Sequence, residues 1–224
     1  MTGEEDEQAL LRRQLDRERR ARREAEEIAE RTTRSLFDRQ RELELQAQVA
    51  RAANESDGSA EGLERILEAL CELGGWQLAQ LYLTAEDGES LRPTEIWFSP
   101  EPVRFGEFRA ASTESRYEVG RGLPGLVLRS GEPLVIPDVL EDHRFFRQEA
   151  ARASAIRGAF AFPASSGGRT FAVVELFATS TVHEDEAMIE TAVSIGSQVG
   201  RLVERERSER TIAELRKALD SARR

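Results

Sequence analysis

Charged residues dominate the first quarter of the chain, and apolar residues interrupt them at helical intervals. Residues 6–53 contain no proline or glycine, and alanine, arginine, glutamate, glutamine and leucine prevail there. These residues favour helix, so the pattern predicts one helix of about 45 residues. A possible coiled-coil seam follows spacings of three, four or seven: Leu11, Leu15, Arg22, Ala25, Ala29, Thr32, Leu36, Leu43 and Ala50. A charged single helix or a partly disordered tail is the alternative.

Small and polar residues break this helix at residues 54–62, and the pattern of a compact domain follows. Leucine, isoleucine and cysteine recur at helical spacing between residues 59 and 73, which predicts a helix. Alternating apolar and polar positions predict strands over residues 77–83 and 91–98. Residues 99–117 have no regular pattern, so we expect an irregular connection that carries aromatic side chains.

The second half of the domain alternates short helical and strand patterns. We expect short helices at residues 123–129 and 145–153 and a short strand at 133–136. Residues 158–163 and 170–178 read as a hairpin closed by a Ser-Gly-Gly turn. The sequence therefore predicts an α+β domain, with a central antiparallel sheet of five or six strands flanked by helices.

A last helix is predicted from the capping-box pattern Thr181-Val-His-Glu184 to the end of the sequence. It carries two apolar stripes that differ in phase. The first is Met188, Ala192, Ile195, Val199 and Leu202, and the second is Ile212, Leu215, Leu219 and Ala222. The first stripe can pack on the sheet. The second lies beyond any core and calls for a partner helix, so we expect a homodimer paired through the N- and C-terminal helices.

Charge and composition exclude several classes of function. The net charge of −10 argues against a nucleic-acid partner. No apolar run approaches the ~18 residues of a membrane span, and the acidic N-terminus lacks the apolar region of a signal peptide. We therefore expect a cytoplasmic protein with no membrane partner.

The residues suited to metal or redox chemistry are few. Cys71 is the only cysteine, and His143 and His183 are the only histidines, so we expect no disulfide, no metal and no cofactor. Cys71 lies in an apolar helical stripe and reads as a small core residue. The Gly120-x-Gly122-x-x-Gly125 pattern follows no strand of a βαβ unit, so we interpret it as a turn and helix start rather than a nucleotide loop.

Several short motifs together resemble the GAF domains of bacterial sensor proteins, particularly those in front of histidine kinases and diguanylate cyclases. The motifs are Gly122-Leu-Pro-Gly125, Ser130-Gly-Glu-Pro133, Asp138-Val139, Phe160-Ala-Phe-Pro163 and Val174-Glu-Leu-Phe177. The likeness covers residues from about 62 to 205. It implies a GAF fold with a sensory role: a small molecule or partner changes the packing of the core, and dimeric helices pass the change to an effector domain or partner kinase. It implies no catalytic residue.

In GAF domains ligands lie between the sheet and the short helices and loops on one face. This likeness points to residues 99–117 and 138–156, where eight aromatic and polar groups gather: Trp97, Phe98, Tyr117, His143, Arg144, Phe145, Phe146 and Arg147. The strands add Phe160 and Glu175, whose carboxylate in an apolar run needs a partner, for which Arg144 and Arg157 are candidates. Our candidate ligand-binding set is Trp97, Tyr117, Arg144, Phe145, Phe160 and Glu175.

Two other readings stay open. The aromatic residues can fill the pocket, which would leave a dimerisation spacer with no ligand. A small GAF-type enzyme is the weaker alternative, because no nucleophile and base stand together in the sequence. We divide the chain into an N-terminal signalling helix (1–53), a linker (54–62), the GAF core (63–183) and a C-terminal helix that continues into a coiled coil (184–224).

Overall fold

The computed structural model describes residues 2–55 and 60–222, with side chains described over residues 17–55 and 60–221. The chain divides into two compact units, Met1–Leu43 and Glu44–Arg224. We describe each unit by itself.

The first unit is the outer part of helix α1 (Thr2–Glu55), which confirms the predicted long helix. Exposed ion pairs at helical spacing join Arg22 to Glu26 at 2.8 Å and Arg39 to Glu42 at 2.7 Å. Four large apolar side chains are more than half exposed: Ile28, Leu36, Phe37 and Leu43. Leu36 and Leu43 belong to the predicted seam, whereas the side chains of Leu11 and Leu15 lie outside the described residues. The coiled coil stays a prediction.

The last turns of α1 belong to the second unit. Leu45, Val49 and Ala52 are buried in its hydrophobic core, although sequence patterning assigned residues 1–53 to a separate helix. The predicted linker, 54–62, includes residues 56–59, which lie outside the described part of the chain.

A six-stranded antiparallel sheet forms the centre of the second unit, which confirms the predicted α+β class. Its strands, in the spatial order β3-β2-β1-β6-β5-β4, are β3 (Tyr117–Glu118), β2 (Ser90–Phe98), β1 (Leu78–Thr84), β6 (Arg169–Ala178), β5 (Gly158–Ser166) and β4 (Leu134–Ile136). The central strands β1, β6 and β5 are buried along most of their length.

The stretch predicted to be irregular, 99–117, contains a helix, α3 (Gly106–Glu114), and ends in the two-residue strand β3. Helix α3 shows no apolar period in the sequence, because Phe108 and Ser112 are its only buried residues. Packing of Phe108 in the core therefore stabilises a helix that the pattern of apolar residues does not predict.

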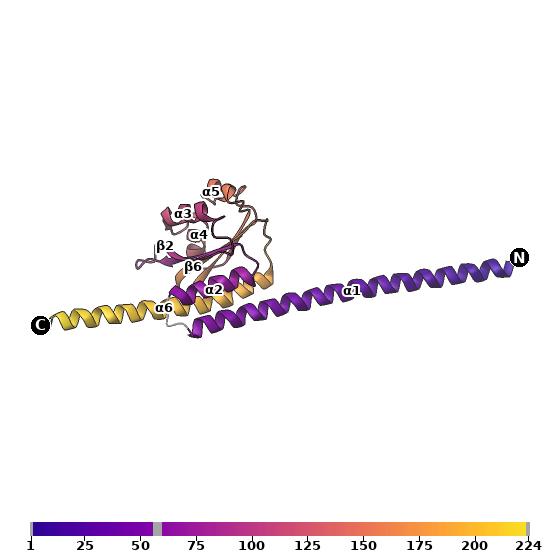
Figure 1. Cartoon of the computed structure of the whole chain (residues 1–224), viewed down its shortest axis with the longest axis horizontal. Coiled ribbons are helices and arrows are strands. Elements are labelled where there is room, and N and C mark those ends of the chain that lie inside the picture. Colours follow the sequence, from indigo (N-terminus) through magenta and orange to yellow (C-terminus); the bar gives the residue numbers. More distant parts are fainter. Residues whose placement is uncertain (1, 56–59, 223–224) are drawn as a thin grey trace. The chain divides into compact units, whose positions relative to one another are not determined.

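Helices cover both faces of the sheet, as Figure 1 shows for this unit. On one face lie α2 (Ala60–Glu72), α6 (Glu186–Ala222) and the last turns of α1. On the other lie α3, α4 (Gly122–Ser130) and α5 (Gln148–Ala153). Two separate hydrophobic clusters result, one between the sheet and each helical layer.

Helix α6 begins later than predicted. Residues 181–185 are irregular, and Asp185 caps the helix: its carboxylate accepts a hydrogen bond from the Ala187 N–H at 3.3 Å. The capping-box interpretation of Thr181-Val-His-Glu184 was therefore wrong. The Val182 N–H donates to the Pro137 carbonyl instead, which holds this segment beside the loop before α5.

Two glycines let α6 approach β5 closely. A Cβ built on Gly196 would lie 2.3 Å from the Pro163 carbonyl oxygen, and one on Gly200 would lie 2.4 Å from the Ser165 backbone. Ile195, Val199 and Leu202 of the same helix are buried against the sheet. This contact attaches α6 to the domain core.

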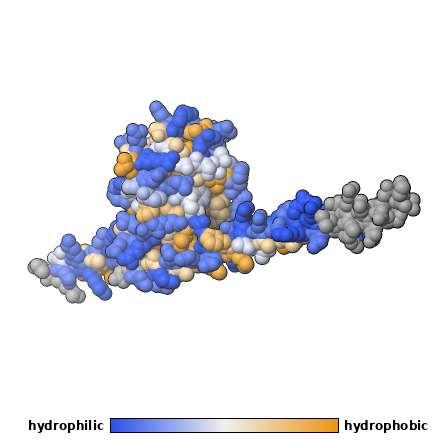
Figure 2. All heavy atoms as spheres, turned by 45° about the vertical axis from the view of Figure 1, so that its right-hand side comes forward, coloured by the Kyte–Doolittle hydropathy of each residue, from blue (hydrophilic) through white to orange (hydrophobic). Residues whose placement is uncertain are grey.

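The surface of the second unit is mostly hydrophilic with interspersed apolar side chains (Figure 2). Among the described residues, no helix combines the length and apolar character needed to cross a membrane.

Candidate functional site

A buried polar cluster lies on the sheet face that α3 and α5 cover. Because side chains alternate along a strand, Gln80 and Tyr82 of β1 point to the same face. Gln80 is paired directly with Glu175 on the neighbouring β6. The Gln80 side-chain amide donates to the Tyr82 hydroxyl at 2.8 Å and to a Glu175 carboxylate oxygen at 2.7 Å. Strand register thus assembles this part of the site.

Arg147, the residue before α5, completes the cluster. Its Nη2 donates to both carboxylate oxygens of Glu175, each at 2.8 Å. Its Nη1 donates to the Ser112 hydroxyl of α3 at 2.6 Å and to the Tyr82 hydroxyl at 3.2 Å. The side chains of Arg147 and Glu175 are 5% and 0% exposed, so this is a fully buried ion pair.

Aromatic rings surround the Arg147 guanidinium. Its central carbon lies 4.8 Å from the Phe108 ring centre, 5.0 Å from Phe145 and 5.4 Å from both Tyr117 and Phe177. Distances of this size permit cation–π attraction, which is stronger where water is excluded. The cluster is therefore an aromatic cage with one carboxylate and two hydroxyl groups.

The cage keeps its cation charged and its phenol neutral. Burial is the largest single effect and lowers the pKa of Arg147, but the charges of Glu175, Tyr82 and Tyr117 and the hydrogen bond to Glu175 together raise this pKa above its usual value. Burial raises the pKa of the Tyr82 hydroxyl, with the charges of Arg147 and Glu175 acting in opposite directions. Burial likewise raises the pKa of Tyr117. Arg147 therefore stays charged, and the Tyr82 and Tyr117 hydroxyl groups stay neutral, across the physiological pH range.

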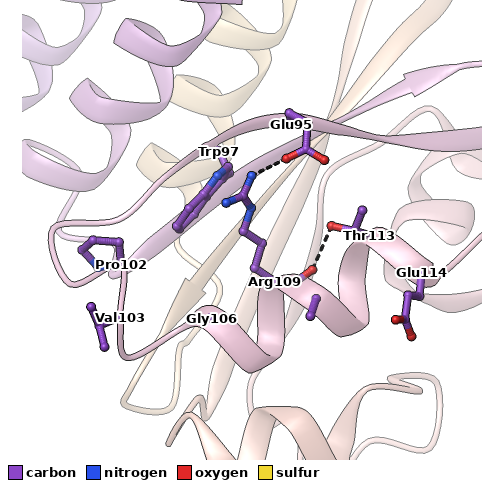
Figure 3. Close-up of a pocket in the computed structure, with 9 residues that line it drawn as sticks. Glu95, Trp97, Pro102, Val103, Gly106, Arg109, Thr113 and Glu114 are labelled. Atoms are coloured by element: carbon purple, nitrogen blue, oxygen red, sulfur yellow. Dashed lines mark hydrogen bonds and ion pairs between the residues drawn. The ribbon is translucent and has the colours of Figure 1, made fainter.

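An open cleft lies on the surface beside this cluster, between the end of β2, the loop before α3 and α3 itself (Figure 3). Its volume is about 610 Å³. The Arg109 guanidinium stacks on the Trp97 ring at 4.1 Å and forms an ion pair with Glu95. Pro102 and Val103 form part of the apolar wall. The cleft thus offers an aromatic face and a paired arginine to solvent.

A small cavity separates the cleft from the buried cluster. Gln80, Tyr82 and Ser112 line it from the cluster, and Trp97 and Arg109 line it from the cleft. Its volume, about 10 Å³, is close to the minimum for one water molecule. The two sites are therefore neighbours that share a thin polar boundary.

Comparisons with known proteins agree on the fold. The family model described as GAF domain matches residues 58–204, more than half of the chain. The chain belongs to the GAF family. No curated protein matches it.

Solved GAF structures cover most of this chain at low sequence identity. The GAF domain of a phosphoenolpyruvate-protein phosphotransferase from Coxiella burnetii is 15% identical, with a TM-score of 0.64 over 77% of this chain and 98% of that one. The A. aeolicus NlH2 GAF domain in an inactive state is 19% identical, with a TM-score of 0.59 over 75% and 98%. A free methionine-R-sulfoxide reductase from Neisseria meningitidis in complex with its substrate is 19% identical, with a TM-score of 0.60 over 75% and 91%. These likenesses show the fold alone.

The GAF fold gathers some of the predicted site residues and separates others. Tyr117, Phe145 and Glu175 meet in the cage. Trp97 lies at its edge, in the open cleft. Phe160 lies on the opposite face of the sheet, where it stacks on Trp76 at 5.8 Å.

The proposed partners of Glu175 were wrong. Arg144 is exposed, and its guanidinium binds Asp142 at 2.6 Å. Arg157 pairs with Asp138 near the surface. The hydrogen bond from Arg144 lowers the pKa of Asp142, and that from Arg157 lowers the pKa of Asp138. Both arginines stabilise the loop before α5, whereas Arg147 reaches the interior.

Sequence reasoning missed Gln80, Ser112 and Arg109 and did not select Arg147 among the arginines of its segment. Gln80 had a usable signal, because it shares a strand face with Tyr82 in an otherwise apolar run. Ser112 had none, because its helix was not predicted. Only tertiary structure distinguishes Arg147 from the nearby Arg144.

The motifs with alternative readings have ordinary structural roles in this GAF domain. Gly122 has a φ of 66°, and a Cβ there would lie 2.8 Å from the Tyr117 ring, so the glycine-rich segment is a tight helix start. The Cys71 thiol is buried and lies 3.7 Å from the Phe98 carbonyl oxygen. Burial, followed by the charge of Glu72, raises the pKa of this thiol to about 12. Within the described residues, no three His, Cys, Asp or Glu side chains gather as a metal site.

Proposed function

We propose that this chain is a signal-relay GAF domain that works as a homodimer. A small molecule or partner changes the packing on the sheet face that carries the Arg147 cage, and α6 passes the change to an effector. A histidine kinase or a diguanylate cyclase is the effector class that the sequence motifs favour.

The observation that carries this proposal is the double role of α6. Its first half is part of the core, with Ile195, Val199 and Leu202 buried. Its second half exposes an apolar stripe: Ile212 is 49% exposed, Leu215 60% and Leu219 61%. A rigid helix couples these halves, because any shift on the sheet moves the stripe.

A second copy of the chain is the occupant that fits this stripe. Spacings of three and four place Ile212, Leu215 and Leu219 on one side of α6, as in the seam of a coiled coil. An isolated helical end of this length is marginal in water unless another helix covers it. Parallel pairing of two α6 helices would cover both stripes at once and keep the two GAF cores in the same orientation.

The sheet face with α3 and α5 is the sensing face in this proposal. It holds the buried Arg147–Glu175 ion pair, and the cleft beside Trp97 gives solvent a route toward it. Pockets for small molecules are typically apolar with a few placed polar groups, which describes both the cleft and the cage.

The proposal is tested first by oligomeric state. Sedimentation of the full chain should show a dimer at micromolar concentration. Leu215→Glu and Leu219→Glu, which place a charge in the stripe, should shift it to monomer. Ala213→Glu lies off the stripe on the same helical turn and should leave the dimer intact. A monomeric wild type, or a control that dissociates equally, would refute pairing through α6.

The relay is tested separately with spin labels on the two α6 helices. In a Cys71→Ala background, Ser221→Cys places one label on each chain, away from the stripe. Glu175→Gln perturbs the cage and should change the label-to-label distance distribution. An unchanged distribution in a folded dimer would mean that the cage is not coupled to α6.

A dimerisation spacer with an occluded pocket is the second candidate function. The observation that favours it is the filled interior, where Arg147 occupies the space between four aromatic rings. A thermal-shift screen separates the two functions, because a ligand of the folded state raises its apparent stability. If the domain is a spacer, we expect no stabilising ligand in this screen and no coupling between the cage and α6.

A regulatory role is proposed over a catalytic one because of Cys71. A nucleophilic thiol needs a lowered pKa and some exposure, whereas Cys71 is buried and its pKa is raised to about 12. The Neisseria structural neighbour is a free methionine-R-sulfoxide reductase. Assaying this chain for reduction of free methionine sulfoxide, with Cys71→Ala as control, tests that activity directly.

A further inference from the structure

The cage around Arg147 has the chemistry of a recognition site. One carboxylate faces Nη2, two hydroxyl groups face Nη1, and four rings surround the guanidinium plane at 4.8 to 5.4 Å. Nη2 donates to both carboxylate oxygens while Nη1 donates to the two hydroxyl groups, so the site engages two nitrogens of one planar group, which a compact ammonium with a single nitrogen does not offer. The walls therefore select a guanidinium group.

Arg147 and most of the side chains that surround it come from different segments of the chain. Strands β1 and β6 supply Tyr82, Glu175 and Phe177, and α3 supplies Phe108 and Ser112. Arg147 instead stands at the junction between the irregular loop that follows β4 and the six-residue helix α5. Phe145 stands two residues before Arg147 in the same loop, so this ring would move with Arg147. The walls on β1, β6 and α3 belong to other segments and can stay in place when the Arg147 side chain turns outward.

Exchange of this arginine for a free cation preserves the charge balance of the site. Emptying the cage would leave the Glu175 carboxylate buried with the Gln80 amide but without a charged partner, which is strongly destabilising. An incoming guanidinium restores the pair and the cation–π contacts, and Arg147 regains water. The exchange replaces one buried cation with another, so it avoids the main electrostatic penalty of opening the site.

We propose that the cage is a binding site for a ligand that carries a guanidinium group, and that Arg147 occupies it as an intramolecular substitute when the ligand is absent. This inference rests on the proposed sensory function and adds the chemical class of the signal. Ligand binding would expel the Arg147 side chain and change how α5 and its preceding loop pack on the sheet.

The first test removes the Arg147 side chain from the cage. Arg147→Ala should lower the melting temperature, and ethylguanidinium, a probe that matches the lost group, should raise it again by about 5–10 °C at a hundredfold excess over its dissociation constant. Ethylurea has nearly the same shape without charge and should have no effect. Ethylammonium has the charge without the planar fork and should have a smaller effect.

Matched variants locate the response. Arg144→Ala removes an exposed arginine three residues away and should show no dependence on ethylguanidinium, because Arg144 lies outside the cage. The double variant Arg147→Ala with Glu175→Gln should lose the selectivity for ethylguanidinium over ethylurea. Equal responses of Arg147→Ala and Arg144→Ala would overturn the proposal.

The second test uses the wild type and needs no variant to fold. In protein labelled with ¹⁵N-arginine, the Nε–H signal of Arg147 should be protected from solvent exchange. Titration with arginine amide should move this signal to the position of exposed arginines. An Arg147 signal that stays fixed at saturating arginine amide would show a permanent structural ion pair and refute the proposal.

These outcomes are separable from failure of the relay. If Arg147 is displaced while the distance between the Ser221→Cys spin labels stays the same, the binding site is supported and its coupling to α6 is refuted. Loss of the dimer in Leu215→Glu, with guanidinium binding intact, would show that recognition belongs to the single GAF domain.

Discussion

Substitution of Gly200 by alanine sets two opposing effects against each other on the helix that we propose as the relay. Alanine is favoured over glycine inside a helix by about 0.8–1 kcal/mol, so propensity alone predicts a more stable protein. The packing of α6 on β5 predicts the reverse. The new Cβ would lie 2.4 Å from the Ser165 carbonyl carbon and oxygen and 2.5 Å from its nitrogen.

The steric effect should win. Ordinary contact begins near 3.4 Å, so α6 must move by about 1 Å relative to β5. Backbone atoms of a central strand cannot yield as a flexible side chain does, and overpacking of this kind costs about 1–3 kcal/mol. A gap of 1 Å also forfeits up to half of the dispersion attraction around Val199 and Leu202. We expect a net loss of about 1–3 kcal/mol, or a melting temperature lower by roughly 4–8 °C for a loss near 2 kcal/mol.

Urea unfolding of the full chain, followed by circular dichroism, measures this loss. The control is Gly106→Ala at the first position of α3, where a Cβ meets no atom within 4 Å. This variant should stay within about 0.5 kcal/mol of the wild type or gain stability. A Gly200→Ala protein as stable as the wild type would refute the close helix–strand contact.

Two further predictions concern single side chains. Cys71 should resist a thiol reagent in the folded protein and react on unfolding, whereas an added Ser221→Cys thiol should react at once; Cys71→Ala should cost about 1 kcal/mol. Asp142 has a folded-state pKa below its usual 3.8 because Arg144 donates to it. Its ionisation therefore stabilises the fold above that unfolded-state pKa, and the stabilisation is lost as the pH falls through the folded-state pKa. Chemical unfolding of Asp142→Asn should show a deficit below about 1 kcal/mol at neutral pH that disappears in strong acid; a deficit independent of pH would contradict this assignment.

The periodicity of apolar residues in the sequence predicted those helices and strands whose buried positions recur at a regular interval. The helices at both ends and the strands β1, β2, β5 and β6 could be predicted because one side of each is apolar at a fixed interval. The motifs resembling GAF domains then placed these elements in the correct fold family. The sequence also predicted that the Glu175 carboxylate has a partner, because a charged group within an apolar run requires one.

Tertiary structure alone decided which groups meet. Arg144, Arg147 and Arg157 look equivalent in the sequence, yet only Arg147 lies where loop and strand geometry bring a guanidinium to Glu175. Phe160 looked like a pocket residue, but strand alternation turns it to the opposite face. Helix α3 escaped prediction because it buries only Phe108 and Ser112, so no repeated apolar positions mark it in the sequence. The local sequence determines the periodicity of apolar residues within a segment. The contacts of a side chain depend also on segments that are distant in the sequence, and folding of the backbone brings these segments together.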